Sequence, residues 1–148
     1  MKRILLFVFP AVMAFGCQDR AKPNVCGLEL KLVKMTSSWT GDVDAGDDLA
    51  WEETIVLRND SSFLKRRIQA GAVSEATGHY TYVDQEDGHY VELTYDHPES
   101  DLRSSCSSTE FIGIKSTTLF QNTAWPACDG STLEYEAHPA PCGKQAGS

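Results

Sequence analysis

The chain has 148 residues and a formal net charge of −8, and 41% of its residues are hydrophobic. This length suits one modest domain. The acidic balance argues against binding nucleic acid, or binding anionic lipid through charge, because both require a basic surface. Without residues 1–16, which include Lys2 and Arg3, the net charge falls to about −10.

The amino-terminal segment has the pattern of a secretory signal peptide. Lys2 and Arg3 precede an apolar run of 12 residues from Ile4 to Phe15. A run of this length is too short to cross a bilayer as a permanent helix, but it suits an export signal. We therefore expect residues 1–16 to be a signal peptide.

The run ends in Ala14-Phe15-Gly16-Cys17, and this ending resembles the lipobox of bacterial lipoproteins. In that family the cysteine receives a diacylglyceryl group and the peptide is cut before it. The resemblance implies a lipid anchor at Cys17, and several acyl chains hold a protein on a membrane durably. Gln18 stands where lipoproteins kept at the inner membrane have aspartate, so the resemblance points to the outer membrane. The alternative is a plain secretory signal cut elsewhere.

The cysteine count favours lipidation over the alternative. Five cysteines in an exported chain leave one unpaired, and Cys17 stands where an odd cysteine would carry lipid. Residues 17–25 then form a polar, lipidated tether. Residues 26–148 form a single β domain with an extended carboxyl-terminal tail.

Strands are predicted along the whole domain. Leu28, Leu30 and Leu32 alternate with polar or charged residues, which is the period of a half-buried strand, and this period returns in later segments. No amphipathic helix of convincing length is present. We expect an all-β fold, either an antiparallel up-and-down barrel or a sandwich, with about 7–8 short strands and two disulfides.

An acidic segment at residues 41–48 contains four aspartates, and Glu53 lies eleven positions after Asp42. One interpretation is a calcium loop, with Asp42 and Asp44 at its first and third positions. However, the sixth position requires glycine and is Asp47, and no helices flank the segment. A solvated acidic loop is the expectation.

The first predicted hairpin turns at Asn59-Asp60. The run at residues 65–67 is the only basic one in the mature domain, and its interpretations are an anion site or a surface charge ladder. The ladder is favoured because glutamates lie across the hairpin. The expected pairs are Ile55 with Leu64, Glu53 with Arg66 and Glu52 with Arg67.

The second predicted hairpin spans residues 77–96 and turns at Asp87-Gly88, because glycine tolerates the positive φ of a type I′ turn. One face then carries apolar and aromatic residues: Tyr80, Tyr82, Val91, Leu93 and Tyr95. The expected pairs are Glu86 with His89, Tyr82 with Leu93, Tyr80 with Tyr95, Thr81 with Thr94 and His79 with Asp96.

The third predicted hairpin runs from Thr109 to about Asn122 and turns near Ser116-Thr117, with Ile112 and Ile114 facing Leu119 or Phe120. Extending its pairing brings Cys106 close to Cys128, within reach of a disulfide. Elimination then joins Cys26 to Cys142, which ties the first strand to the end of the chain. A local bond between Cys128 and Cys142 is the alternative.

The last strand is expected at residues 132–137, because the two prolines in residues 138–141 interrupt a ladder and favour an extended tail.

The sheet content, the succession of hairpins and the position of Trp39 resemble small lipocalin-like lipoprotein barrels. The Gly-x-Trp signature is absent, since Ser37-Ser38 precede Trp39. Trp39, Trp51 and Trp125 are more often core residues in a β domain of this size, and Trp125, in the long loop before Cys128, is the one expected to be exposed. The candidate contacts for a ligand or partner are Trp125 and Trp39.

No motif for catalysis or metal binding is recognisable. There is no nucleophile elbow, and the four histidines lack zinc-site spacing. We therefore expect a non-enzymatic envelope lipoprotein without a cofactor, whose β domain binds an unknown protein or small molecule. The alternatives are a lipocalin-type carrier, which requires an open interior, and an envelope enzyme with a buried, perturbed ionisable group in a cleft.

Overall fold

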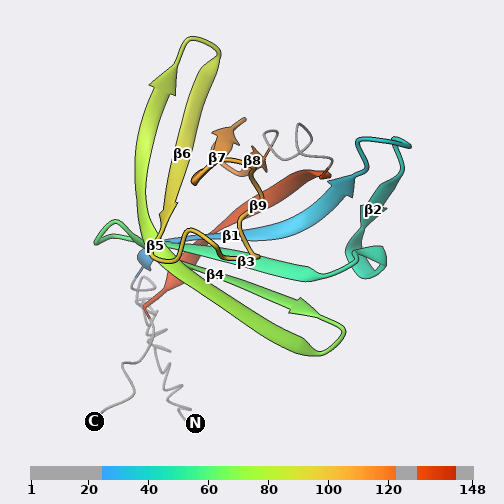
Figure 1. Cartoon of the computed structure of the whole chain (residues 1–148). Coiled ribbons are helices and arrows are strands. Elements are labelled where there is room, and N and C mark those ends of the chain that lie inside the picture. The colour runs from blue at the N-terminus through green and yellow to red at the C-terminus, as the bar shows by residue number, and fades with distance from the viewer. Residues whose placement is uncertain (1–24, 123–129, 143–148) are drawn as a thin grey trace, which may run out of the picture.

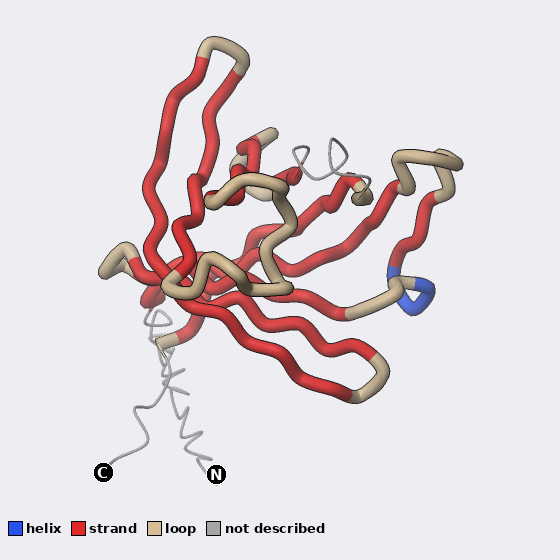
Figure 2. The backbone as a smooth tube through the Cα atoms, viewed as in Figure 1, coloured by secondary structure: helices blue, strands red, loops and turns tan. Residues whose placement is uncertain are grey.

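A computed structural model describes residues 25–122 and 130–142, and Figure 1 shows them as a barrel of strands. The strands in these ranges are β1 (Val25–Thr36), β2 (Val43–Ala45), β3 (Glu52–Arg58), β4 (Ser62–Gln69), β5 (Ala72–Gln85), β6 (Gly88–Tyr95), β7 (Thr109–Ile114), β8 (Leu119–Asn122) and β9 (Thr132–Pro141). The helical content of the same ranges is one short 3-10 turn, η1 (Gly46–Asp48), coloured blue in Figure 2.

Eight strands close into an antiparallel up-and-down barrel. Hydrogen-bonded neighbours follow the order β1-β3-β4-β5-β6-β7-β8-β9, and β9 pairs back with β1. The additional strand β2 pairs with β1 beyond the last pair of β1 with β3, Lys31 with Thr54. The all-β prediction is confirmed, and the architecture is the barrel. Two strands are longer than expected, because β1 has 12 residues and β5 has 14.

The alternation predicted for β1 is confirmed. Leu30 and Leu32 are buried in the barrel, and Leu28 packs against the same core. The pairing with β9 shifts between Leu32 and Lys34. This bulge changes which residues face inward, so that Met35 is the next buried residue.

One end of the barrel is closed by a disulfide between Cys26 and Cys142, whose Cα atoms lie 4.8 Å apart. Figure 1 shows the start of β1 and the end of β9 side by side there. This pairing is the one predicted, and it excludes the alternative bond between Cys128 and Cys142. The second predicted bond, from Cys106 to Cys128, stays a prediction because Cys128 lies outside the described residues.

The predicted end of the last strand is wrong. β9 continues through residues 138–141, where Pro139 pairs with Leu28 and Pro141 with Val25. The ladder tolerates both prolines because β8 pairs with β9 only as far as Glu136, which leaves β9 with one free edge beyond it. The prolines are two residues apart, so their nitrogens lie on the same side of the strand.

The β5–β6 hairpin exists, but its register differs from the prediction by two residues. The turn is Glu86-Asp87, and Gln85 pairs with Gly88. A type I′ turn requires positive φ at both central residues. Neither Glu86 nor Asp87 has it, so this turn is not of type I′. A shift of two residues preserves the faces. The observed pairs include Tyr80 with Leu93, Tyr82 with Val91, His79 with Thr94, Thr81 with Glu92 and Asp84 with His89.

The β3–β4 hairpin differs from the prediction by one residue, and this difference has large consequences. Its loop has three residues, 59–61, and the last of them, Ser61, has a φ of 65°. Three-residue hairpin loops commonly end in this left-handed conformation. A shift of one residue exchanges the faces of a strand. The observed pairs include Ile55 with Lys65, Glu53 with Arg67 and Glu52 with Ile68.

The third hairpin is confirmed as β7 and β8, with Ile114 paired with Phe120. Side chains from all eight barrel strands or their flanks pack into a common core, in which Leu93 and Ile112 are fully buried. Tyr82 is an exception to the predicted apolar face, because 61% of its surface is exposed. The inward-facing side chains therefore fill much of the space that a deep ligand cup would need.

Candidate functional site

Three charged side chains lie fully buried inside the barrel. Glu53 on β3, Lys65 on β4 and Glu110 on β7 have at most 1% of their surface exposed. The Lys65 ammonium lies 3.0 Å from both carboxylate oxygens of Glu110 and 3.2 Å from Oε1 of Glu53. Buried ions are costly unless they are paired, and each of these has a partner of opposite charge in direct contact.

Glu53 binds a second cation through its other oxygen. Nε and Nη2 of Arg67 lie 2.7 and 2.6 Å from Oε2, and the Tyr135 hydroxyl donates to Oε1 at 2.7 Å. The Arg67 guanidinium also lies over the indole ring of Trp51, 4.5 Å from its centroid. The two negative charges of the carboxylates are thus balanced by the two positive charges of the lysine and the arginine. The interior ion cluster, as we call it, consists of Glu53, Lys65, Arg67 and Glu110.

The cluster keeps Glu53 ionised and the neighbouring tyrosines neutral. Burial by itself raises the pKa of the Glu53 carboxyl. The charges of Lys65 and Arg67 and the hydrogen bonds to Glu53 outweigh this, so that the pKa lies below its ordinary value of 4.5. Burial, and then the negative charge of nearby carboxylates, raises the pKa of Tyr95 and Tyr135. Both hydroxyls therefore donate, Tyr95 to Glu110 and Tyr135 to Glu53.

The loop between β6 and β7, residues 96–108, packs onto the cluster through Ser104, which is fully buried. The Ser104 N–H donates to Glu110 at 3.2 Å, and its carbonyl accepts from the Asn122 amide at 2.9 Å. Its hydroxyl accepts from Lys65 at 3.4 Å. Asn122 also donates to Glu110 at 2.8 Å. The loop is thus fixed to the cluster by side chains of three strands.

The predicted surface ladder of the basic run is wrong. The one-residue shift of the β3–β4 hairpin turns Lys65 into the barrel and sets Arg67 against Glu53. Arg66 is the exposed member of the run, and its Nε lies 3.6 Å from Glu75 on β5. An inward lysine could not be predicted here, because a charged residue in an alternating strand is expected to face the solvent.

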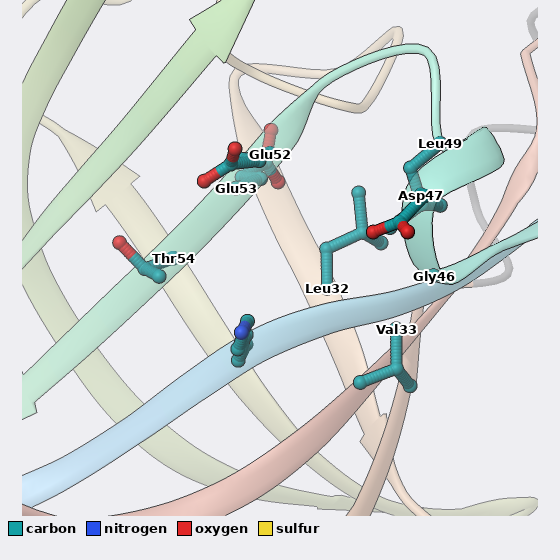
Figure 3. Close-up of a pocket in the computed structure, with 9 residues that line it drawn as sticks. Leu32, Val33, Gly46, Asp47, Leu49, Glu52, Glu53 and Thr54 are labelled. Atoms are coloured by element: carbon teal, nitrogen blue, oxygen red, sulfur yellow. The ribbon is translucent and has the colours of Figure 1, made fainter.

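A cavity of about 540 Å³ opens in the barrel wall between β1 and β3 (Figure 3). The pairing of β1 with β3 ends at Lys31 and Thr54, and its pairing with β2 begins at Lys34 and Ala45. The strands therefore part at residues 32–33. We call this cavity the wall pocket. Its apolar lining includes Leu32, Val33 and Leu49, its charged lining includes Lys31, Asp47 and Glu52, and Glu53 adjoins it from the interior ion cluster.

The acidic segment 41–48 is exposed throughout. Glu53, the distal ligand in the calcium interpretation, directs its oxygens to Lys65, Arg67 and Tyr135 instead. Within residues 25–122 and 130–142, no group of three or more His, Cys, Asp or Glu side chains is placed to hold a metal ion.

The described tryptophans differ in exposure. Trp39 is 76% exposed in the loop after β1, Trp51 is half-buried against the core, and Trp125 lies outside the described residues.

The four histidines are all exposed. His89 lies 2.6 Å from Asp84, its cross-strand neighbour. The histidines are therefore dispersed over the surface.

Comparisons with known proteins found no relatives. No family model matches the chain, and neither the curated proteins nor the solved structures include a significant match. The described part of the chain has no helix of the length and apolarity needed to cross a membrane.

Glu53 combines features that the enzyme alternative predicts, since it is buried, has a shifted pKa and adjoins a pocket. Its chemistry nevertheless suits charge pairing better than proton transfer. Both of its oxygens already accept strong bonds, and a carboxylate whose pKa is lowered is a weak base. The arrangement therefore fixes the barrel and leaves the wall pocket and the exposed loops as the surfaces available to a ligand.

Proposed function

We propose that the chain is an envelope lipoprotein, held at the outer membrane by lipid on Cys17, whose barrel is a non-catalytic module that binds another protein. One observation carries the binding role: Trp39 is 76% exposed, in the loop that follows the end of β1 remote from the Cys26–Cys142 disulfide. Tryptophan is enriched among the residues that dominate binding energy at protein interfaces.

An ordered turn presents Trp39. The Ser37 hydroxyl accepts hydrogen bonds from the backbone N–H groups of Trp39 and Thr40, both at 3.3 Å. The Gly41 N–H donates to the Ser37 carbonyl at 3.0 Å, and the Ser37 N–H donates to the Asp42 carbonyl at 2.9 Å. Gly41 has a φ of 74°, which glycine adopts without strain. A side chain on an ordered turn gives up less conformational entropy when it binds.

The surroundings of Trp39 define the chemistry of its partner. We call residues 37–48 the distal face. Val43 there is 57% exposed, and the four aspartates of segment 41–48 are exposed beside it. The distal face contains no lysine or arginine. Its complement is an apolar depression surrounded by basic residues, and the opposite charges would speed the encounter.

The proposed anchor leaves the distal face accessible. Cys17 precedes Cys26 by nine residues, so the lipid would keep the disulfide end within about 30 Å of the membrane. The distal face follows the other end of β1, about ten strand residues or 33 Å along the barrel. Figure 1 shows this loop on the opposite side of the barrel from the start of β1.

Photo-crosslinking in the native envelope tests this proposal. A photoreactive amino acid replaces Trp39 in one variant and Tyr82, exposed on the β5–β6 hairpin, in the control. We expect a discrete protein adduct from position 39 only, with lysine or arginine near the crosslinked site of the partner. The yield should fall when Asp42 and Asp44 are changed to asparagine. Equal crosslinking from position 82, or no effect of the aspartates, would contradict the proposal.

The anchor is tested separately by the intact mass of membrane-extracted protein. We expect a chain that begins at Cys17 and carries a lipid-sized increment. A mature chain with a free thiol at Cys17, or with a different amino terminus, would contradict the anchor and leave the binding role to be judged by the crosslinking result.

A further inference from the structure

We infer that the wall pocket receives a lysine or arginine side chain of the partner protein. This inference rests on the proposed function and deepens it, because the pocket opens beside the distal face: Asp47 belongs to both. A volume of about 540 Å³ lies within the range of specific ligand sites, roughly 300 to 1,000 Å³. The pocket is therefore large enough for a long side chain.

The pocket exists because of the strand arrangement. β3 leaves β1 after the pair Thr54 and Lys31, while β1 continues to Thr36 with β2 along the vacated edge. The η1 segment then returns over the gap and brings Leu49 and Asp47 opposite β3 (Figure 3). The pocket lining thus comes from two stretches of the chain, residues 31–33 and 46–54.

The lining divides into an apolar part and a charged part. Leu32, Val33 and Leu49 provide aliphatic contacts, while the carboxylates of Asp47 and Glu52 come from opposite walls. Basic side chains have the same division, with an aliphatic stem and a cationic head. A hydrophobic ligand would leave these carboxylates without a partner, whereas a simple ion would leave the aliphatic contacts unused.

The charge balance favours a cation. Glu53 is neutralised by Lys65 and Arg67 inside the barrel. Asp47 and Glu52 have no ion-pair partner within 4.0 Å among the described residues, so their charges are available at the pocket. Against them stands one cation, Lys31, which also lines the pocket. The uncompensated charge of the lining is therefore negative.

Binding of blocked amino acids, followed by backbone amide NMR on the folded chain, tests the inference. The probe is N-acetyl-lysine methylamide, and the control probe is N-acetyl-norleucine methylamide, which has the stem without the charge. We expect the lysine probe to bind with a Kd on the order of 1 mM, as suits so small a ligand. It should shift the amide signals of Leu32, Val33 and Leu49, and the norleucine probe should bind more weakly.

Matched variants locate the charge effect. Glu52→Gln and Asp47→Asn should each weaken the lysine probe about three- to fivefold, which corresponds to one partly exposed ion pair. Glu86→Gln removes an exposed carboxylate in the β5–β6 turn that neither lines the pocket nor belongs to the distal face, and it should change the Kd by less than about twofold. Lys31→Gln removes the opposing cation and should tighten binding.

Three results would overturn the inference: no shifts at the pocket, equal weakening by Glu86→Gln, or weaker binding after Lys31→Gln. None of them would affect the crosslinking expected from position 39. Conversely, loss of that crosslinking with intact lysine binding would overturn the proposed partner surface and leave the pocket as a site for free basic molecules.

Discussion

The two ends of the barrel interior are stabilised in different ways. Near the disulfide, the inward residues of β3 and β4 are apolar, with Leu57 and Phe63 fully buried. Towards the other end, the same two strands contribute Glu53, Lys65 and Arg67 to the interior ion cluster. One hairpin thus contains both kinds of core.

The difference between the apolar end and the charged end of the barrel shows what specifies the register of the β3–β4 hairpin. Apolar side chains pack with many neighbours, and cores tolerate exchanges of similar volume. An ion cluster requires particular partners, because an unpaired buried charge costs several kcal/mol. A one-residue slip of β4 would turn Lys65 outward and leave Glu53 and Glu110 without it. The charged end therefore selects the register, while the apolar end supplies most of the hydrophobic burial.

The largest effect is expected at the apolar end, from removal of the disulfide. Cys26 and Cys142 are separated by 116 residues, and a loop of that length is worth about 5 kcal/mol of unfolding free energy on the chain-entropy model. Urea unfolding of the Cys26→Ser/Cys142→Ser variant measures this loss. An unchanged free energy of unfolding would show that the bond does not stabilise the closure of β1 on β9.

The next largest effect is expected at the charged end, from Lys65→Met. This change leaves two buried carboxylates with Arg67 as their only cation in the cluster, and breaking a buried pair costs about 3–5 kcal/mol. Arg66→Met is the matched control, because Arg66 is the exposed neighbour of Lys65. We expect it to change the free energy of unfolding by less than about 1 kcal/mol. Equal effects of the two variants would contradict the buried cluster.

A smaller effect is expected in the pH dependence of stability. Glu53 has a lowered pKa in the folded chain, so its ionised form contributes stability above its ordinary value of 4.5. That contribution is lost as the pH falls below 4.5 through the folded pKa. Glu53→Gln should therefore flatten the decline of unfolding free energy in this range. Leu57→Ala, at the apolar end, should lower stability and keep the wild-type slope. Equal slopes for wild type and Glu53→Gln would contradict this assignment.

Much of the architecture could be predicted from local patterns. The alternation at residues 28–32 and the hairpins identify an all-β chain. Closure was predicted by elimination, because pairing Cys106 with Cys128 leaves Cys26 for Cys142, and the latter bond is observed. The turns could not be placed as well. Asn59-Asp60 suggests a two-residue loop, but Ser61 joins it. In both the predicted and the observed register, each face of the β3–β4 hairpin carries apolar as well as charged residues. The hydrophobic pattern therefore did not distinguish the two registers.

The candidate site was predicted only in part. Trp39 and the acidic segment 41–48 are recognisable in the sequence and are exposed in the structure. The interior ion cluster was missed, because it gathers residues from three strands of two hairpins and requires the correct register of one of them. The wall pocket was missed because it arises where β3 parts from β1, which depends on the length of β1 and the return of η1.

The central claim is that Lys65 lies inside the barrel, and amine-specific labelling of the folded protein with peptide mass spectrometry tests it most directly. Lys34, on β1, has a side chain that is 38% exposed and serves as the internal reference, whereas the Lys65 side chain is 0% exposed. We predict that Lys65 stays unmodified under conditions that modify Lys34 to completion, and that it becomes reactive after unfolding. Modification of Lys65 at the rate of Lys34 in the folded protein would contradict the register, the ion cluster and the barrel interior described above.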